Sequence, residues 1–410
     1  MARWWLVVAV VVVTCVVWSF NAALMPPIVS LSLDKLYILG RNGLANFKAI
    51  SSTDTIDTNF FNGSKMNSCT GRCSSLLNLQ REKHEYLYDT RTNRNEIKKF
   101  LVYGDHQPAV SMDFSGCYAS MCKMIYNKTD WREADVIIIT DETYPLADRP
   151  SDQIWMILVH ESPLHLNIVE GLGDKVNFTV TYRLDSTIYS SYGAYKPASL
   201  ADYNPSRRYP LPSRNYAEGK TKMAAWFVSN CNAKSPRNQY ATELSNYISI
   251  DIYGRCGFKE CPRSSESECF ELLRKDYKFY LSFENSLCKD YVTEKFFKNA
   301  LTNDVIPIVM GASIEEYKMI APPYSFIHVD EFESPAKLAE YLYYLNRNDT
   351  AYNEYFAWHG HGVIQNWIAQ PQCDMCLLAH TAHLIGPSWY SDVSKWWKDG
   401  CVGRKLRWGS

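Results

Sequence analysis

One stretch of this 410-residue chain, KFYLSFENSLCKDYVTEKFFKNALTNDVIPIVMG, constrains the fold more than any other. Two short apolar runs within it, Phe279 to Phe283 and Val305 to Met310, favour buried strands. Between these runs, apolar residues recur at helical spacing from Val292 onward. The stretch therefore predicts a β-α-β unit of a parallel sheet.

Charged residues in this unit raise a question about function. Glu284 and Asn285 follow the first predicted strand, at the end of the strand where ligands gather in open α/β sheets. Lys295 stands beside Glu294 in the first turn of the predicted helix, where its charge opposes the positive end of the helix dipole. An anionic ligand would remove this conflict. The alternative is the exposed Glu-Lys face of an ordinary helix.

The amino terminus predicts entry into the secretory pathway. No charge occurs between Arg3 and Asp34, and a mostly apolar run extends from Trp4 to Met25. Because Trp residues flank this run, we interpret residues 4–25 as a transmembrane signal anchor that leaves residues 1–3 in the cytoplasm. A cleaved signal peptide is the alternative. In both cases the rest of the chain enters the lumen.

Cysteines and glycosylation motifs agree with an oxidising lumen. Only Cys15 of the 13 cysteines lies in the anchor, and the even number that remains favours disulfides whose connectivity the sequence leaves open. The segment CDMCLLAHTAH has a spacing that imitates a zinc site, but disulfides are favoured in this compartment. Four Asn-x-Ser/Thr motifs begin at Asn62, Asn127, Asn177 and Asn348. The net charge of −1 gives no basic excess for a nucleic-acid partner.

The remaining chain divides into a stem and two series of secondary-structure signals. Residues 26–95 are polar and weakly patterned, which is typical of a luminal stem. The first series has strand-like runs at residues 100–103, 135–140, 154–159 and 176–182.

A segment rich in Pro, Arg and Ser at residues 203–220 predicts a linker, and the second series follows it. This series alternates strands and helices, including a helix with Ser334 as N-cap and Pro335 at its first position. Two such series predict an α/β protein with two Rossmann-like domains that face a cleft.

A second carboxylate could carry chemistry in the first domain. Glu161 follows the long apolar strand IWMILV and precedes Ser-Pro, so it is a candidate general base, or alternatively a capping or surface glutamate. His160 points the other way and is expected to pack locally. Arg183 and Asp185 end the next strand and either orient a substrate or pair with each other.

A phosphate ligand in the second domain would depend on side chains, because no Gly-rich loop lies near the predicted strand ends. Lys295 could neutralise a phosphate as a point charge, and Arg237 could bind one with a bidentate fork. Glu284 or Glu294 could accept hydrogen bonds from a ribose or another sugar. The chain has no Asp-x-Asp, which argues against a transferase that binds its nucleotide through manganese at that motif.

These motifs together resemble the inverting α1,3-fucosyltransferases of the Golgi, glycosyltransferase family 10. The resemblance spans about residues 100–376 and is strongest in YKFYLSFENSLCKDYVTEKFFKNAL and VIPIVMG. The segments HESP, TYRLDS, WFVSNCNAKSPR and the late Cys-x-x-Cys also match. The insert GRCGFKECP resembles invertebrate members.

The resemblance implies a GT-B fold, with an acceptor domain at 96–215, a GDP-fucose domain at 216–360 and a segment at 361–410 that packs back on the body. It implies transfer of L-fucose from GDP-β-L-fucose to the 3-hydroxyl of a GlcNAc in a glycoprotein glycan, with inversion and with Glu161 as the base. No cofactor is obligatory, although a divalent cation could stimulate the reaction. The implied donor-binding residues are Ser229, Asn230, Arg237, Tyr253, Glu284, Asn285, Tyr291, Glu294 and Lys295.

The family also implies a location and a disulfide pattern. The protein is expected in the Golgi membrane as a single-pass type II protein with a luminal body. The family ties its C-terminal segment to the first domain, so Cys373 and Cys376 are expected to pair with distant cysteines such as Cys69 and Cys73. Core and antennal GlcNAc both remain open as acceptors, and the oligomeric state is open too.

A hypothesis of another class is an inactive, membrane-anchored glycan-binding protein on the same fold. Loss of Glu161, Arg237 or Lys295 would favour it, but all three residues are present.

Overall fold

The computed structural model describes residues 95–104, 112–141, 143–145, 148–166, 172–199, 204, 206–366, 371–385 and 388–409. These residues all belong to one compact unit. The predicted anchor at 4–25 lies outside them, as does almost all of the predicted stem. Across the described ranges, no helix combines the length and apolar character that crossing a membrane requires.

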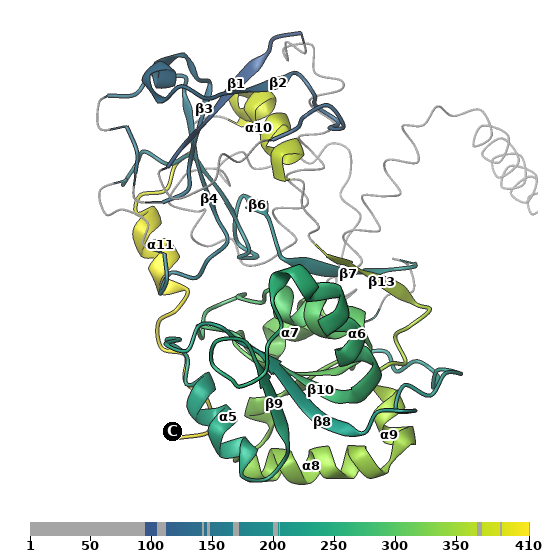
Figure 1. Cartoon of the computed structure of the whole chain (residues 1–410). Coiled ribbons are helices and arrows are strands. Elements are labelled where there is room, and N and C mark those ends of the chain that lie inside the picture. Colours follow the sequence, from purple (N-terminus) through teal and green to yellow (C-terminus); the bar gives the residue numbers. More distant parts are fainter. Residues whose placement is uncertain are drawn as a thin grey trace, which may run out of the picture. The chain divides into compact units, whose positions relative to one another are not determined.

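Six parallel strands form the first sheet, in the order β2-β1-β3-β4-β5-β6 (Figure 1). The strands are β1 (Lys98–Tyr103), β2 (Cys122–Ile125), β3 (Val136–Ile139), β4 (Ile154–Val159), β5 (Phe178–Thr181) and β6 (Ile188–Tyr189). The four strand-like runs of the first series correspond to β1, β3, β4 and β5, so those predictions are confirmed.

Helices from the far end of the chain cover this sheet. On one face Val136 and Ile138 belong to the same hydrophobic cluster as residues of α10 (Pro371–Ile385). On the other face Ile137 and Ile139 cluster with residues of α11 (Val393–Asp399). A central parallel strand buried on both faces is a continuous apolar run, which is why β3 reads VIII. Figure 1 shows α10, near the end of the chain, beside β1 and β2 near its start.

The first sheet differs from its prediction in the source of its helices. A Rossmann-like domain, as the sequence predicted, has helices between its strands, but the described connections of this sheet contain only the short 3-10 helix η3 (Lys128–Glu133). Its helical cover comes instead from α10 and α11, which follow the second sheet in the chain.

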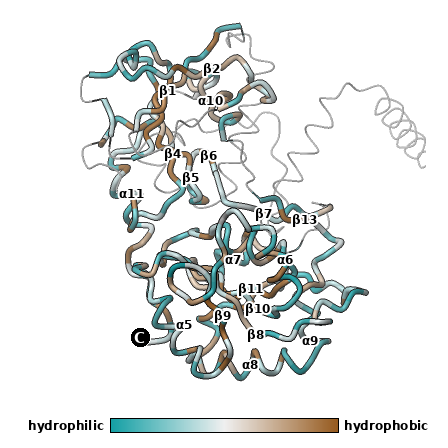
Figure 2. Tube along the Cα trace, in the orientation of Figure 1, coloured by the Kyte–Doolittle hydropathy of each residue, from teal (hydrophilic) through white to brown (hydrophobic). Residues whose placement is uncertain are grey.

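Five parallel strands form the second sheet, in the order β12-β11-β10-β8-β9. The strands are β8 (Lys222–Phe227), β9 (Ile250–Tyr253), β10 (Tyr277–Phe283), β11 (Ile306–Met310) and β12 (Ile327–His328). The α-helices between and after them are α5 (Arg237–Ser245), α6 (Glu266–Asp276), α7 (Ile314–Ile320), α8 (Pro335–Arg347) and α9 (Asp349–Glu354). Short 3-10 turns occur at η4 (Arg263–Ser265) and η7 (Val329–Glu331). Figure 2 shows hydrophobic stretches along β1 in the first sheet and along β10 and β11 in the second.

The β-α-β prediction is confirmed, with one difference in the helix. β10 and β11 pair in parallel, with Phe279 opposite Ile306. The connection is a π-helix, η5 (Lys295–Ala300), followed by the 3-10 turn η6 (Leu301–Asn303), whereas the spacing predicted an α-helix. In α8 the predicted cap is confirmed, because the Ser334 hydroxyl accepts the backbone N–H of Lys337.

A small antiparallel pair joins two distant segments. Strand β7 (Gly193–Pro197) pairs with β13 (Gly362–Asn366). The described part of the predicted linker, residues 206–220, contains neither a helix nor a strand.

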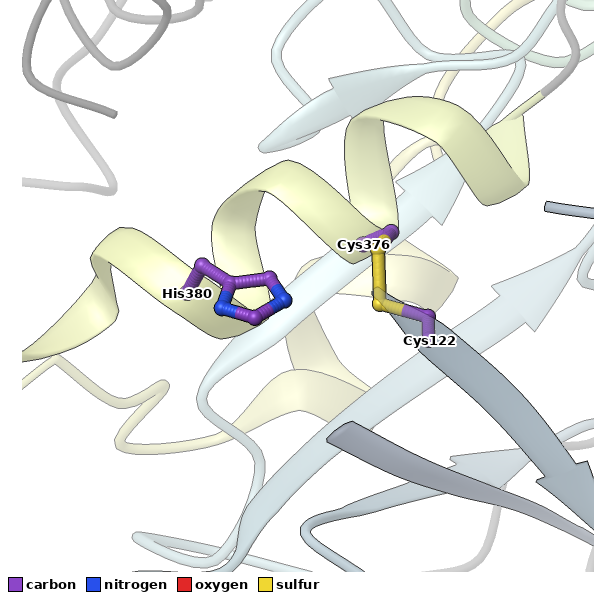
Figure 3. Close-up of side chains that lie close together, drawn as sticks. All are labelled: Cys122, Cys376 and His380. Carbon is purple, nitrogen blue, oxygen red and sulfur yellow. A yellow bond between two sulfur atoms is a disulfide. The ribbon is translucent and has the colours of Figure 1, made fainter. Parts of the chain in front are cut away.

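Two disulfides attach α10 to the first sheet. Cys117 bonds to Cys373, and Cys122 of β2 bonds to Cys376, as the close-up in Figure 3 shows for the second pair. Oxidation of both α10 cysteines to partners outside their own pair is confirmed. The suggested partners Cys69 and Cys73 are wrong, because the partners of Cys373 and Cys376 are Cys117 and Cys122. Three more disulfides join Cys231 to Cys256, Cys261 to Cys269 and Cys288 to Cys401.

We predict that the first two disulfides contribute to stability non-additively. Their sequence separations are 256 and 254, so each alone closes a very large loop, but with one intact the other closes only a small ring. In the chain-entropy model, losing either bridge then costs about 3 kcal/mol, and losing both costs more than twice that. Guanidinium denaturation of Cys→Ala pair variants measures this, with the variant lacking Cys261–Cys269 as control. The prediction would be contradicted if removal of one disulfide cost half as much stability as removal of both.

Candidate functional site

Glu161 lies two residues beyond the carboxyl end of β4, in a loop that its neighbour anchors. The His160 imidazole Nε2 and the Ser190 hydroxyl are 2.8 Å apart, and the His160 ring packs edge-on against Tyr192. Burial lowers the pKa of His160 to about 4, so the ring is neutral near physiological pH. The prediction that His160 packs locally is confirmed.

One oxygen of Glu161 collects three hydrogen bonds. Its Oε1 accepts the Tyr291 hydroxyl at 2.7 Å, the Asn285 side-chain amide at 3.1 Å and the backbone N–H of Ser162 at 2.9 Å. Two of these donors follow β10 of the second sheet, and the third belongs to the β4 loop. The half-buried Glu161 is therefore a point where side chains from both sheets meet.

A closed polar ring supports this contact. The Ser286 hydroxyl donates to Asn285 Oδ1 at 2.9 Å and lies 2.6 Å from the Ser162 hydroxyl. Because each hydroxyl has one proton, Ser162 must donate to Ser286. Both serines are fully buried, and the backbone N–H of Ser162 returns to Glu161.

Glu284, the first residue after β10, carries a fully buried carboxylate. Its oxygens accept the backbone N–H of Thr293 at 2.8 Å, the Thr293 hydroxyl and the Lys295 ammonium at 3.1 Å. The side chain fits only because residue 311 is glycine, since a Cβ there would lie 2.7 Å from Glu284 Cγ. Glu284 is thus built into the fold as the partner of Lys295.

Lys295 lies between two carboxylates. Its ammonium also donates to the Thr293 hydroxyl at 2.8 Å and to Glu294 Oε1 at 3.2 Å. Although burial opposes the charged form, Glu284 and Glu294 hold the pKa of Lys295 above its ordinary value. The sequence suggested an anionic ligand that would balance this lysine, and in the structure two carboxylates already lie beside it.

Arg237 at the start of α5 is 2% exposed and points its guanidinium toward the end of β10. Its Nη1 donates to the backbone carbonyl of Phe283 at 3.0 Å, and its Nη2 donates to that of Asn230 at 2.6 Å. The buried Nε has no hydrogen-bond acceptor among the described residues. A buried donor without an acceptor is uncommon and calls for an explanation such as a ligand.

The other predicted donor-binding residues lie in different surroundings. Ser229 is exposed, and the Asn230 side chain accepts the backbone N–H of Asn232 within its own turn. The Tyr253 hydroxyl lies 2.8 Å from that of Tyr277, which donates to Asp251. The contacts therefore gather Glu161 with Asn285 and Tyr291, and Lys295 with Glu284 and Glu294, while Tyr253 belongs to a separate chain of hydroxyls.

Arg183 and Asp185 form a bidentate pair, with nitrogen–oxygen distances of 2.8 and 2.7 Å. Lys289 adds a third contact to Asp185 at 2.9 Å. Of the two alternatives, mutual pairing describes these residues.

The zinc-like motif is a disulfide site. Cys122, Cys376 and His380 lie together, but both sulfurs belong to the disulfide shown in Figure 3. Disulfide sulfur is not the thiolate that zinc requires. His380 Nε2 lies 3.0 Å from the backbone carbonyl of Met121.

Sequence reasoning missed the small polar residues that hold the charged ones. Thr293 bridges Glu284 and Lys295, and Ser286 belongs to the polar ring. Ser235 donates its hydroxyl to the carbonyl of Glu284 and its N–H to that of Asn285. Their only signal was their position within or beside the motifs that contain the acids.

Asp290 is a further buried acid near this region. It has a left-handed backbone with φ of 58°, and its carboxylate accepts the backbone N–H of Leu184 at 3.0 Å. Burial, reinforced by repulsion from Glu316, raises the pKa of Asp290 to about 7.

Family models match most of the described chain. The model for glycosyltransferase family 10 (fucosyltransferase) C-term matches residues 217–396, and that for fucosyltransferase N-terminal matches residues 95–193.

Curated relatives give the same picture. Glycoprotein 3-alpha-L-fucosyltransferase A of Drosophila melanogaster is 44% identical over 299 residues, which are 71% of this chain and 57% of that protein. Alpha-(1,3)-fucosyltransferase C of the same organism is 34% identical over 356 residues, which are 78% of this chain and 81% of that protein. A crystal structure of an alpha1,3-fucosyltransferase with GDP-fucose is 16% identical, with 72% of this chain and 92% of that chain covered and a TM-score of 0.45.

We predict that Asp290 makes stability depend on pH. Its pKa is raised from an ordinary value near 4 to about 7, so the folded protein holds a proton there that the unfolded chain releases. This contribution is fully present below pH 4 and is lost as pH rises through 7. Asp290→Asn tolerates the left-handed backbone and can still accept the Leu184 N–H.

The free energy of unfolding of both proteins should therefore be measured by denaturant titration at pH 5 and pH 8. The variant is expected to lose less stability between the two values than the wild type. The same pH dependence in both proteins would show that Asp290 is not the group responsible.

Proposed function

The chain belongs to glycosyltransferase family 10, the fucosyltransferases, and we propose that it transfers L-fucose from GDP-β-L-fucose to the 3-hydroxyl of a GlcNAc in a glycoprotein glycan. The names of two relatives describe 3-alpha-L-fucosyl transfer, in one case to glycoproteins and in the other to 4-galactosyl-N-acetylglucosaminides. One structural observation carries the proposal to this chain. The candidate base Glu161 accepts a hydrogen bond from Asn285, and the residue before Asn285, Glu284, pairs with Lys295.

In the proposed reaction, Glu161 removes the proton from the acceptor hydroxyl as its oxygen bonds to C1 of fucose. The bond from C1 to the phosphate oxygen breaks on the opposite side, so the configuration inverts and GDP leaves with the bonding electrons. The proton remains on Glu161 until it passes to water. General-base catalysis of this kind contributes about 10²–10⁴-fold to a rate.

Arg237 and Lys295 are the proposed cations for the diphosphate. Arg237 carries a buried N–H without an acceptor, which an anionic ligand would satisfy. The cluster of Lys295 with two carboxylates has a formal charge of −1, so a diphosphate requires one carboxylate to leave. Glu294 is the one expected to turn toward the donor's sugar, because its side chain is 45% exposed and that of Glu284 is fully buried.

The remaining predictions complete the proposal. The two sheets are the Rossmann-like domains of a GT-B fold, with residues 96–215 facing the acceptor and 216–360 binding the donor. Residues 4–25 anchor the protein in the Golgi membrane as a type II protein. Ser229, Asn230 and Tyr253 contribute to the nucleotide side, and divalent cations act at most as stimulators.

Glu161→Gln tests the base. The amide keeps the size of the side chain and an oxygen for the three donors, but it removes the basicity. Turnover of GDP-fucose with a GlcNAc-terminated glycan is expected to fall by about 10²–10⁴-fold, while GDP affinity measured by calorimetry stays unchanged. Glu268→Gln, at an exposed position of α6, is the matched control. Near-normal turnover in Glu161→Gln would assign the base to another residue.

Lys295 requires a paired design. Lys295→Met alone leaves Glu284 buried without its partner, which costs about 3–5 kcal/mol and obscures any effect on binding. The double variant Lys295→Met with Glu284→Gln removes both charges and is expected to fold with near-normal stability.

We expect the double variant to bind GDP at least tenfold more weakly, because the cation that faces the diphosphate is lost. Calorimetry measures the binding, and a thermal melt confirms folding. Wild-type GDP affinity in the folded double variant would remove Lys295 from the donor site.

A further inference from the structure

We propose that Tyr291 and Asn285 are positioning residues, which hold Oε1 of Glu161 so that Oε2 is the atom that receives the acceptor's proton. Both residues are expected on the family pattern to line the donor pocket, and their hydrogen bonds give them Glu161 as a further partner. The inference rests on the proposed function and deepens it, because it states how the base is oriented and by which side chains.

The two oxygens of Glu161 have unequal surroundings. Oε1 accepts hydrogen bonds from Tyr291, Asn285 and the backbone of Ser162. Oε2 makes no hydrogen bond or ion pair with any residue in the described ranges. A carboxylate held by three donors at one oxygen has a fixed orientation, and its second oxygen keeps its lone pairs for a ligand.

Tyr291 is committed to this contact by its own burial. Its side chain is 1% exposed, and its ring packs against Tyr182 at a centroid distance of 4.9 Å. Burial raises the pKa of the Tyr291 phenol far above its ordinary value, so the hydroxyl keeps its proton and donates it to Glu161.

Hydrogen bonds hold both ends of the Asn285 side-chain amide. Its Oδ1 accepts the Ser286 hydroxyl, its backbone carbonyl accepts the N–H of Ser235, and its Nδ2 donates to Glu161. These contacts fix which end of the amide faces the carboxylate. A side chain locked in this way can hold another one in place.

Among the described residues, the charge of Glu161 acts on the tyrosines Tyr182, Tyr192 and Tyr291 and on Arg237. Burial raises the pKa values of Tyr182, Tyr192 and Tyr291 well above the ordinary value, so all three stay neutral in the working pH range. Arg237 is the cation of the group.

Tyr291→Phe is the decisive variant, because it removes one hydroxyl and keeps the buried ring. Loss of a hydrogen bond to a charged group is expected to lower kcat by about 10- to 100-fold. The KM for GDP-fucose and the affinity for GDP are expected to stay unchanged.

Tyr240→Phe is the matched control. Tyr240 is also fully buried in the second half of the chain, and its hydroxyl has no hydrogen-bond partner among the described residues. The variant is expected to keep wild-type kcat and KM. A Tyr291→Phe protein that melts like this control while losing turnover has lost positioning and not its fold.

A double variant tests whether Tyr291 acts through Glu161. In the Glu161→Gln background, Tyr291→Phe is expected to reduce kcat by no more than a small further factor. Full multiplication of the two losses would overturn the inference, as would a raised KM for GDP-fucose with unchanged kcat in Tyr291→Phe. Wild-type kinetics in Tyr291→Phe would also overturn it while leaving the proposed function intact. Wild-type protein that releases no GDP with any GlcNAc-containing acceptor would overturn both.

Discussion

The rest of the site depends on the pairing of the buried Glu284 carboxylate with Lys295. Removing a charge from water costs several kcal/mol, and the cost is recovered only when partners surround it completely. Lys295 and both donors of Thr293 provide these partners, and Gly311 provides the space. The positions of all three residues follow from the presence of one acid at the end of β10.

Glu284 also fixes the backbone next to Asn285, which is a hydrogen-bond partner of Glu161. The N–H of Glu284 donates to Met310 of β11, and its carbonyl accepts the Ser235 hydroxyl. Arg237 holds the preceding carbonyl, that of Phe283. The carbonyls of Phe283 and Glu284 and the N–H of Glu284 are thus all hydrogen bonded. Asn285 follows directly and donates to Glu161 from this fixed backbone. Lys295 and Arg237, the proposed cations, are thus linked to Glu161, the proposed base, through Glu284 and Asn285.

Sequence patterns predicted what depends on local physics. Parallel strands such as β3 and β10 are continuous apolar runs because both faces are buried, and the cap at Ser334 needs only three neighbouring residues. The family motifs also brought Glu161, Arg237 and Lys295 together in one proposed site. The helices that cover the first sheet were not predicted, because α10 and α11 follow its last strand by more than 180 residues, and hydrophobic periodicity contains no information about partners.

The same limit explains the errors at the site. Spacing cannot distinguish a π-helix from an α-helix over six residues, and it cannot select Cys117 over Cys69 as a disulfide partner. Contacts such as Glu161–Asn285 span 124 residues, so the sequence showed two acids without showing which surroundings each had. The resemblance placed Asn285 and Tyr291 beside the donor, which stays a prediction, and their hydrogen bonds add Glu161 as a partner.

Environment, and not residue type, finally separates the roles of the two acids. Glu284 is fully enclosed, and both its oxygens are hydrogen bonded within the protein. Glu161 is half-buried, and only one of its oxygens is engaged by the described residues. A base needs a fixed direction and one accessible oxygen, whereas a structural counter-ion needs complete enclosure. Two glutamates at the ends of two strands are therefore proposed to perform opposite tasks, and the hydrogen bonds at each oxygen distinguish the two environments.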